Sequence, residues 1–146
     1  MLMLKNSLKA AAIALMLLAG YGLSSLATSA AAQPPTITRK ILLQHDLAIP
    51  RYEATMIAQE IPVGGREGKH THPGMLVAYI QEGALTVEYE GKPAVTYKAG
   101  DTFYEPSGCV HRVTRNPSAR AKTRLLAVIL HPRDAKEVTV PEKGKE

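Results

Sequence analysis

GGREGKHTHPG, residues 64–74, carries two histidines, His70 and His72, that are separated by a single residue. On a β-strand, alternate side chains point to the same face, so this spacing directs both imidazoles to one side. Neutral imidazole is a common ligand of zinc, copper, iron and nickel ions. Two ligands from one strand need further ligands from elsewhere in the fold, and the rest of the chain has to supply them.

The best candidate for a third ligand is His111, which follows a tight Pro-Ser-Gly turn at residues 106–108. The run from 110 to 114 reads as a strand, so His111 lies near its start. The sequence therefore predicts one divalent transition metal bound by His70, His72 and His111. Three imidazoles fit Fe, Mn, Ni, Cu or Zn, so the metal is left open.

Short runs rich in Val, Ile, Thr and Tyr surround these histidines, and Gly or Pro ends most of them. The predicted strands cover residues 52–61, 76–81, 85–89, 94–97, 102–105, 110–114 and 123–130. Strands of this length with frequent turn signals are typical of a sandwich or barrel. We therefore predict an all-β domain, whose closure would also protect its strand edges.

Two segments resemble the motifs of the cupin superfamily. Residues 64–83 resemble the first motif through Gly64, His70, His72 and Gly83. Residues 100–115 resemble the second motif through Gly100, Pro106, Gly108 and His111. The spacer between the motifs, residues 84–99, is short, as in the minimal barrels of the family. The resemblance implies a single jelly-roll-like cupin β-barrel, as in the small single-domain members of the family that consist of the conserved barrel.

The chain departs from the family pattern at two positions. The glutamate ligand of the first motif would fall at Leu76, and Arg115 stands where the second motif ends in asparagine. A site of three neutral histidines leaves the charge of the ion uncompensated. Cupins with such centres include thiol dioxygenases, so the change lowers the expected affinity without abolishing binding. Glu105 is the candidate substitute carboxylate or general base, although strand parity leaves open whether Glu105 or Tyr104 faces inward.

The resemblance implies a metal-dependent enzyme for a small molecule, with dioxygenase chemistry as the largest class among similar cupins. The alternative is a periplasmic module that binds or senses a small ligand without turnover. Sugar isomerisation is less favoured because the carboxylate ligand is missing. Residues 76, 78 and 80 would give the pocket an apolar floor that suits a hydrophobic ligand. The residues expected in the core or pocket wall are Met75, Leu76, Ile80, Val113 and Leu126.

The N-terminus has the pattern of a secretory signal peptide. Lys5 and Lys9 precede an apolar stretch at residues 10–19, and small residues lead to three alanines ending at Ala32. We predict removal of residues 1–32 and a periplasmic or secreted protein. The apolar stretch is about half of the ~20 residues that a spanning helix needs, so no stable membrane anchor is expected. The barrel would cover residues 33–133, with a frayed tail at 134–146.

The charge and the cysteine and histidine content of the rest of the chain limit which partners are expected. The predicted signal peptide contains two lysines and no acidic residue. Its removal leaves 16 basic and 13 acidic residues, so the net charge of the remaining chain is +3, which is mild. No basic cluster with interleaved aromatics is present, so no nucleic-acid partner is expected. Cys109 is the only cysteine and is predicted to be a small buried hydrophobe. His45 and His131 are expected at the surface, and a homodimer is expected through edge strands near residues 36–43.

Overall fold

The computed structural model describes residues 35–142, so the predicted signal peptide lies outside the described residues. This range contains strands and no helix, and therefore no helix long and apolar enough to cross a membrane. The strands are β1 (Thr38–Asp46), β2 (Tyr52–Ile61), β3 (Arg66–Glu67), β4 (His70–Thr71), β5 (Met75–Glu82), β6 (Ala84–Tyr89), β7 (Val95–Lys98), β8 (Thr102–Glu105), β9 (His111–Arg115), β10 (Thr123–Pro132) and β11 (Val140–Pro141).

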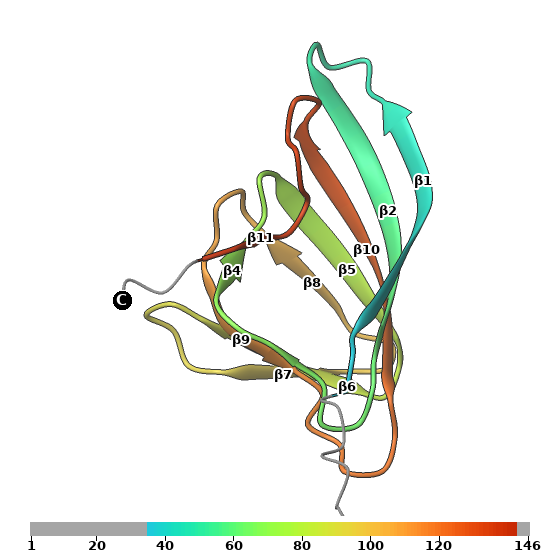
Figure 1. The fold of residues 1–146 in the computed structure, drawn as a ribbon, viewed down its shortest axis with the longest axis vertical. Coiled ribbons are helices and arrows are strands. Elements are labelled where there is room, and N and C mark those ends of the chain that lie inside the picture. The colour runs from blue at the N-terminus through green and yellow to red at the C-terminus, as the bar shows by residue number, and fades with distance from the viewer. Residues whose placement is uncertain (1–34, 143–146) are drawn as a thin grey trace, which may run out of the picture. The chain divides into compact units, whose positions relative to one another are not determined.

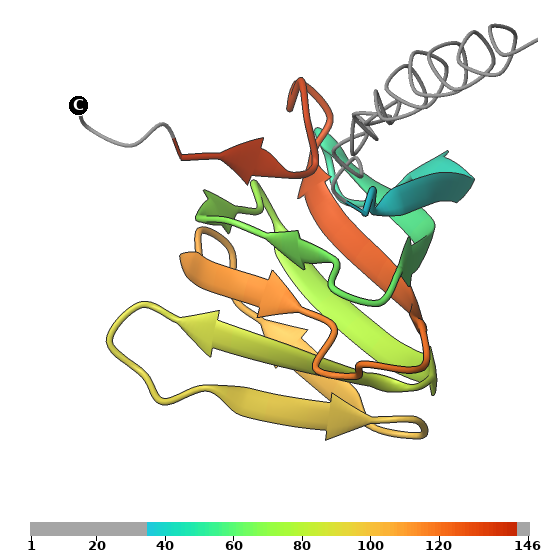
Figure 2. The same cartoon turned by 60° about the horizontal axis from the view of Figure 1, so that its bottom comes forward.

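The strands form two antiparallel sheets, which Figures 1 and 2 show as two layers. Sheet A has the order β1-β2-β10-β5-β8. Sheet B has the order β11-β4-β9-β6-β7, and β3 also pairs with β9. Apart from β1 with β2 and β6 with β7, paired strands come from distant parts of the chain, as in a jelly roll, and this brings β4 and β9 side by side.

The core lies between the two sheets. In β5 the side chains of Leu76, Ala78 and Ile80 are buried, as the sequence predicts, while Leu85 and Val87 of β6 meet them from sheet B. Each large apolar side chain buried in this way contributes about 1.5–3 kcal/mol. Met75 was expected in the core, but it is 41% exposed because it occupies the opposite parity on β5.

The predicted strand positions agree well with the structure. Residues 52–61 and 102–105 coincide with β2 and β8, and the other predicted runs differ from their strands by one or two residues at an end. Gly83 separates β5 from β6 at a φ of 74°, where a Cβ would also meet the backbone carbonyl of Lys122. A glycine is therefore required at this corner.

The sequence predicts a frayed tail from residue 134, but residues 134–142 fold back onto sheet B. Val140 and Pro141 form β11, which pairs with β4. The Glu142 amide donates a hydrogen bond to the Lys69 carbonyl at 3.0 Å, and the Glu142 carboxylate lies 2.9 Å from the Lys69 ammonium. The described part of the tail thus becomes part of the barrel wall beside His70.

The prediction that His131 lies at the surface is wrong, because its side chain is buried in the barrel with 1% exposure. Its Nδ1 lies 2.9 Å from the Pro132 carbonyl, and its Nε2 lies 2.9 Å from Thr55 Oγ1 and 3.5 Å from Glu53 Oε1. The pairing of β10 with β2 places these inward positions together. His45, on β1, is exposed as expected.

Cys109 is partly buried and packs against the hydrophobic core. Burial raises the pKa of its thiol, which keeps it protonated near neutral pH. The sequence prediction that it acts as a small hydrophobe agrees with this placement.

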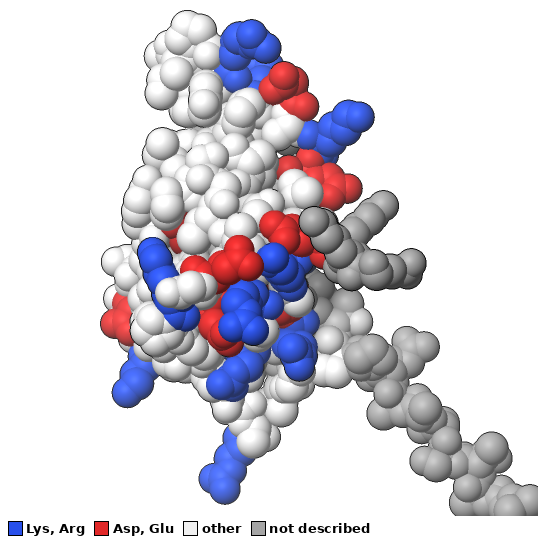
Figure 3. All heavy atoms as spheres, turned by 90° about the vertical axis from the view of Figure 1, so that its left-hand side faces the viewer, with Lys and Arg blue, Asp and Glu red and all other residues white. Residues whose placement is uncertain are grey.

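Charged side chains of both signs share the surface. Figure 3 shows Lys and Arg interspersed with Asp and Glu on one face of the molecule. Exposed ion pairs include Arg112 with Glu88 at 2.9 Å and Arg133 with Asp46 at 2.9 Å. Pairs of this kind contribute little to stability, since water screens them.

Candidate metal centre

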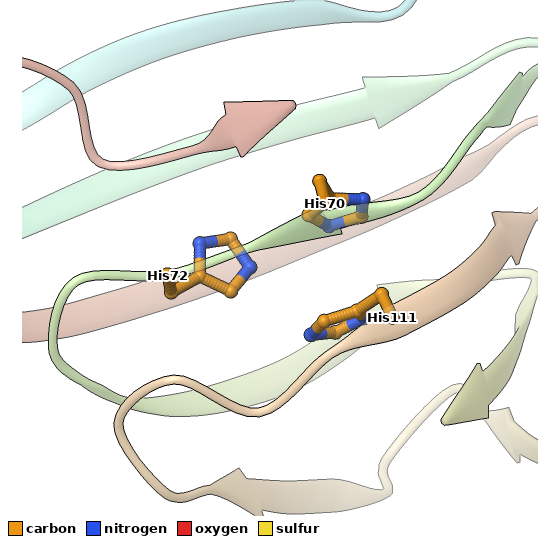
Figure 4. Close-up of side chains that lie close together, drawn as sticks. All are labelled: His70, His72 and His111. Carbon is orange, nitrogen blue, oxygen red and sulfur yellow. The ribbon is translucent and has the colours of Figure 1, made fainter. Parts of the chain in front are cut away.

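The three predicted ligands converge at one point inside the barrel, with their rings directed toward a common space (Figure 4). His70 lies on β4, His72 follows it, and His111 begins β9 directly opposite His70. One ring nitrogen of each residue lies within 4.8 Å of the others, close to twice the ~2.1 Å of a nitrogen–metal bond. The ring centroids of His70 and His111 are 4.4 Å apart.

All three imidazoles are shielded from water. The exposed fractions of His70, His72 and His111 are 4%, 9% and 3%. Burial is the largest cause that lowers the pKa of His70 and of His72 below the usual range. The neutral ring that this favours is the form that binds a metal ion.

Each histidine has a hydrogen-bond partner that orients its ring. The Nδ1–H of His70 donates to the Gly68 carbonyl at 2.8 Å, and that of His72 donates to the Val138 carbonyl at 2.6 Å. His111 Nδ1 lies 3.3 Å from Thr114 Oγ1. The two carbonyl acceptors fix the tautomers of His70 and His72 and leave their Nε2 atoms as the ligand atoms.

The loops around the histidines are tied to each other and to β10. The Gly108 amide donates to the His72 carbonyl at 3.1 Å, and Ser107 Oγ donates to the Pro73 carbonyl at 3.1 Å. A Cβ on Gly74 would lie 2.6 Å from the carbonyl carbon of Leu130. Glycine therefore lets the loop after His72 pass close to β10. These contacts fix the position of His111 relative to His72.

The side chain of Glu105 points into the space between the three histidine rings. The sequence left open whether Glu105 or Tyr104 faces inward, and the structure shows that it is Glu105. Its side chain is 2% exposed, whereas Tyr104 is 60% exposed on the other face of β8. Glu105 Oε2 lies 2.9 Å from His111 Nε2 and 3.9 Å from His72 Nε2. Its other oxygen accepts a hydrogen bond from the Tyr89 hydroxyl at 2.9 Å. The site therefore contains a carboxylate in addition to the three imidazoles.

The position of Glu105 explains the departure at Leu76. Leu76 on β5 and Glu105 on β8 are directly opposite each other in the sheet register. Both side chains point into the barrel, so the neighbouring strand supplies a carboxylate beside the position where the family motif carries one.

The donor set fits a divalent metal ion. Glu105 is a buried carboxylate, and no lysine or arginine within residues 35–142 forms an ion pair with it. A buried carboxylate needs hydrogen-bond donors or a positive partner, and here its neighbours are the Tyr89 hydroxyl and ring nitrogens of His111 and His72. Three imidazoles and one carboxylate are a common ligand set of zinc, iron and other divalent transition metals.

The cavity at this centre is small and mostly apolar. It offers about 40 Å³ to a water-sized sphere, whereas an apolar cavity of ~150 Å³ is known to take benzene. Of the three residues expected to form its floor, Leu76 lines the cavity, whereas Ala78 and Ile80 do not, and Val87 of β6 lines it without having been predicted. A hydrophobic ligand as large as an aromatic ring therefore does not fit inside as the cavity stands.

The mouth of the cavity carries polar residues that the sequence did not single out. Arg39 on β1 forms an ion pair with Glu67 on β3, and Gln59 Nε2 lies 3.5 Å from the other Glu67 oxygen. Arg39, Gln59, Glu67 and Thr139 all line the cavity. Tyr89 and the Val138 carbonyl were missed as well, since each reaches the site through pairing between distant segments.

Comparison with known proteins gives one family and a set of similar folds. The family model for the cupin domain matches residues 58–129, which include all three histidines and Glu105. No curated protein matches the chain.

Similar solved structures come from several organisms. A cupin-like protein of Thermotoga maritima is 19% identical, with a TM-score of 0.56 over 68% of this chain and 71% of that one. An RmlC-like cupin family protein of Methanocaldococcus jannaschii is 19% identical, with a TM-score of 0.54 over 70% and 85%. The DMSP lyase DddQ of Ruegeria pomeroyi is 22% identical, with a TM-score of 0.53 over 64% and 45%. At these identities the likeness shows the double-stranded β-helix fold alone.

Proposed function

Because this chain belongs to the cupin superfamily, we propose that it is a metal-dependent enzyme for a small molecule, with the metal held by His70, His72, His111 and Glu105. The observation that carries the proposal is the buried Glu105 carboxylate, which faces the three imidazoles and has no lysine or arginine partner within the described chain. A divalent metal bound there would supply Lewis-acid or dioxygen chemistry.

The protein groups around the site have separate tasks. The carbonyls of Gly68 and Val138 hold the rings of His70 and His72, and the Tyr89 hydroxyl holds one oxygen of Glu105. Glu105 Oε2 is the carboxylate oxygen closest to His111, so this atom would accept a proton from a substrate if Glu105 serves as general base. The apolar floor excludes bulk water from the reacting groups.

The size of the cavity limits the substrate. About 40 Å³ admits a few atoms, so a larger molecule would enter by its metal-binding end while the rest stays at the mouth. Arg39 and Glu67 line that mouth, and their ion pair would be the first contact of a polar or anionic substituent.

Dioxygenase chemistry is the first reaction class to test. We expect the Fe(II)-loaded protein to consume dioxygen with a small thiol substrate, followed with an oxygen electrode. The His111→Ala variant, treated with iron in the same way, is the control for uptake by free iron. Uptake that is equal in both proteins would contradict the dioxygenase proposal.

The alternative is a binding or sensing module without turnover. The small cavity favours it, because a ligand could complete the metal coordination without space for a second reactant. The fold also serves other chemistry, since the similar Ruegeria pomeroyi protein is named as a lyase. Metal-dependent ligand binding with no product under any condition would support the module.

We also propose export, on the signal-peptide pattern of residues 1–32. Mass spectrometry of the chain recovered from the periplasm or medium should give a mass that lacks these residues. An intact N-terminus on that material, or retention of the chain in the cytoplasm, would contradict export with cleavage.

A further inference from the structure

A second groove lies outside the metal centre, where β7 and β8 follow each other in the chain. Each of these strands is at one edge of its sheet, and residues 99–101 join them. The groove measures about 360 Å³, and its lining residues come from the β6–β7 hairpin, from β8 and from the turn after β8. It shares no lining residue with the cavity beside the histidines.

The volume of the groove suits one small organic molecule. An apolar cavity of ~150 Å³ takes benzene, and pockets for small-molecule ligands begin at ~300 Å³. The groove, at about 360 Å³, exceeds both values, whereas the cavity at the metal centre offers about 40 Å³. An aromatic ring with a substituent therefore has space here that it lacks beside the histidines.

Three tyrosine rings line the groove. Tyr89, Tyr97 and Tyr104 come from β6, β7 and β8. Two of these rings are held by the interior of the protein. Tyr97 stacks on the core residue Phe103 with ring centroids 4.5 Å apart, and the Tyr89 hydroxyl donates a hydrogen bond to Glu105 at 2.9 Å. Fixed aromatic side chains offer a planar ligand ring stacking in addition to burial.

The groove also carries a positive charge. Among the described residues, Lys92 is the only charged one that lines it. The Lys92 ammonium lies 5.9 Å from the centroid of the Tyr89 ring, so the side chain turns toward this tyrosine. Glu88 and Glu90, the acids nearest in sequence, are paired with other basic residues, and Lys92 forms no ion pair within residues 35–142. A cation without a partner thus lies beside aromatic surfaces, which favours an anionic ligand.

We propose that this groove is a second ligand site, which binds a small aromatic carboxylate with its ring against the tyrosines and its carboxylate at Lys92. A mostly apolar pocket with few polar groups that fix the orientation of the ligand is typical of small-molecule sites. Tyr89 separates this site from the metal centre, since its ring lines the groove while its hydroxyl contacts Glu105. The inference does not depend on metal binding or on turnover at that centre.

The test uses benzoate as the probe and Cys109 as the reporter. Cys109 lines the groove and is the only cysteine of the chain, so its modification by N-ethylmaleimide is read from the mass of the intact protein. Saturating benzoate is expected to slow this modification at least about fivefold by covering the thiol, with half-protection near ~1 mM for a molecule of this size. Glutathione treated in the same way checks that benzoate does not inhibit the reagent itself.

Two further probes and two variants separate the ring from the charge. Cyclohexanecarboxylate lacks the aromatic ring and benzyl alcohol lacks the charge, so each should need at least about threefold more for half-protection. Lys92→Gln should raise the half-protecting concentration of benzoate by about threefold. The matched control is Lys98→Gln, which should leave it unchanged, because Lys98 is also exposed but does not line the groove. Both lysines are at the surface, so both variants are expected to fold.

Protection is measured in the chain as purified and again after a chelator has removed any metal. Equal protection in both samples supports the second site, whereas protection that disappears with the metal would place benzoate on the metal and overturn the proposal. No protection at tens of millimolar benzoate would also overturn it. Protection that is as strong with benzyl alcohol as with benzoate, or that is unchanged in Lys92→Gln, would contradict a carboxylate ligand.

Discussion

The His111→Ala variant is expected to lose at least about 1,000-fold in affinity for a divalent metal, since losing even an outer partner of a ligand typically costs 10–100-fold. His111 is the ligand that joins the two parts of the site. It pairs directly with His70 across the sheet, and its Nε2 lies 2.9 Å from Glu105. Its removal therefore deletes a nitrogen ligand and also the nearest partner of the buried carboxylate.

The affinity is measured by competition of Zn²⁺ or Ni²⁺ between the protein and a chromophoric chelator. The control is His45→Ala, because His45 is exposed on β1 and distant in sequence from both motifs. Circular dichroism confirms that each variant is folded. If His111→Ala binds the ion within about tenfold of the wild type, less than the loss of an outer partner would cost, the three-histidine centre is wrong.

Exchanging Leu76 and Glu105 tests whether the carboxylate is a true ligand. Glu105→Leu is expected to lower the metal affinity by about 100-fold, since it removes the only charged donor and leaves three neutral ones. The Leu76→Glu/Glu105→Leu double variant should recover most of that loss. Positions 76 and 105 are opposite on neighbouring strands, where Cβ atoms lie about 4.5–5.5 Å apart, and both side chains are buried.

The exchange leaves the total side-chain volume of the pair nearly unchanged, so packing loss is expected to be small. Leu76→Glu alone is the companion variant, and it places two carboxylates in the site. Full affinity in Glu105→Leu would show that Glu105 is not a ligand. A double variant no better than Glu105→Leu would show that position 76 cannot replace position 105.

Local sequence signals predict the strands and the triad well. Gly and Pro mark the corners, so the ends of β2 and β8 can be placed to the residue. The His-x-His spacing predicts that two rings share a face, because alternation is a short-range feature, whereas His111 joins them through the pairing of β4 with β9.

The remaining features depend on long-range register, which the sequence does not show. Glu105 could be placed inside the barrel only once β8 was known to pair with β5. His131 is buried because β10 pairs with β2, whose Thr55, 76 residues earlier in the chain, lies within hydrogen-bond distance of its ring. The tail looks like a charged, fraying end, yet its Val138 carbonyl fixes the ring of His72. In each case the partner lies far away along the chain.

The most direct measurement is the metal content of the chain purified, without chelators, from its natural compartment. The account predicts one divalent transition-metal ion per chain, by elemental analysis of the wild type, and its loss in the His70→Ala/His111→Ala variant. A wild-type protein that contains only traces of metal, and that takes up none of Fe, Mn, Ni, Cu or Zn when they are supplied, would contradict the account.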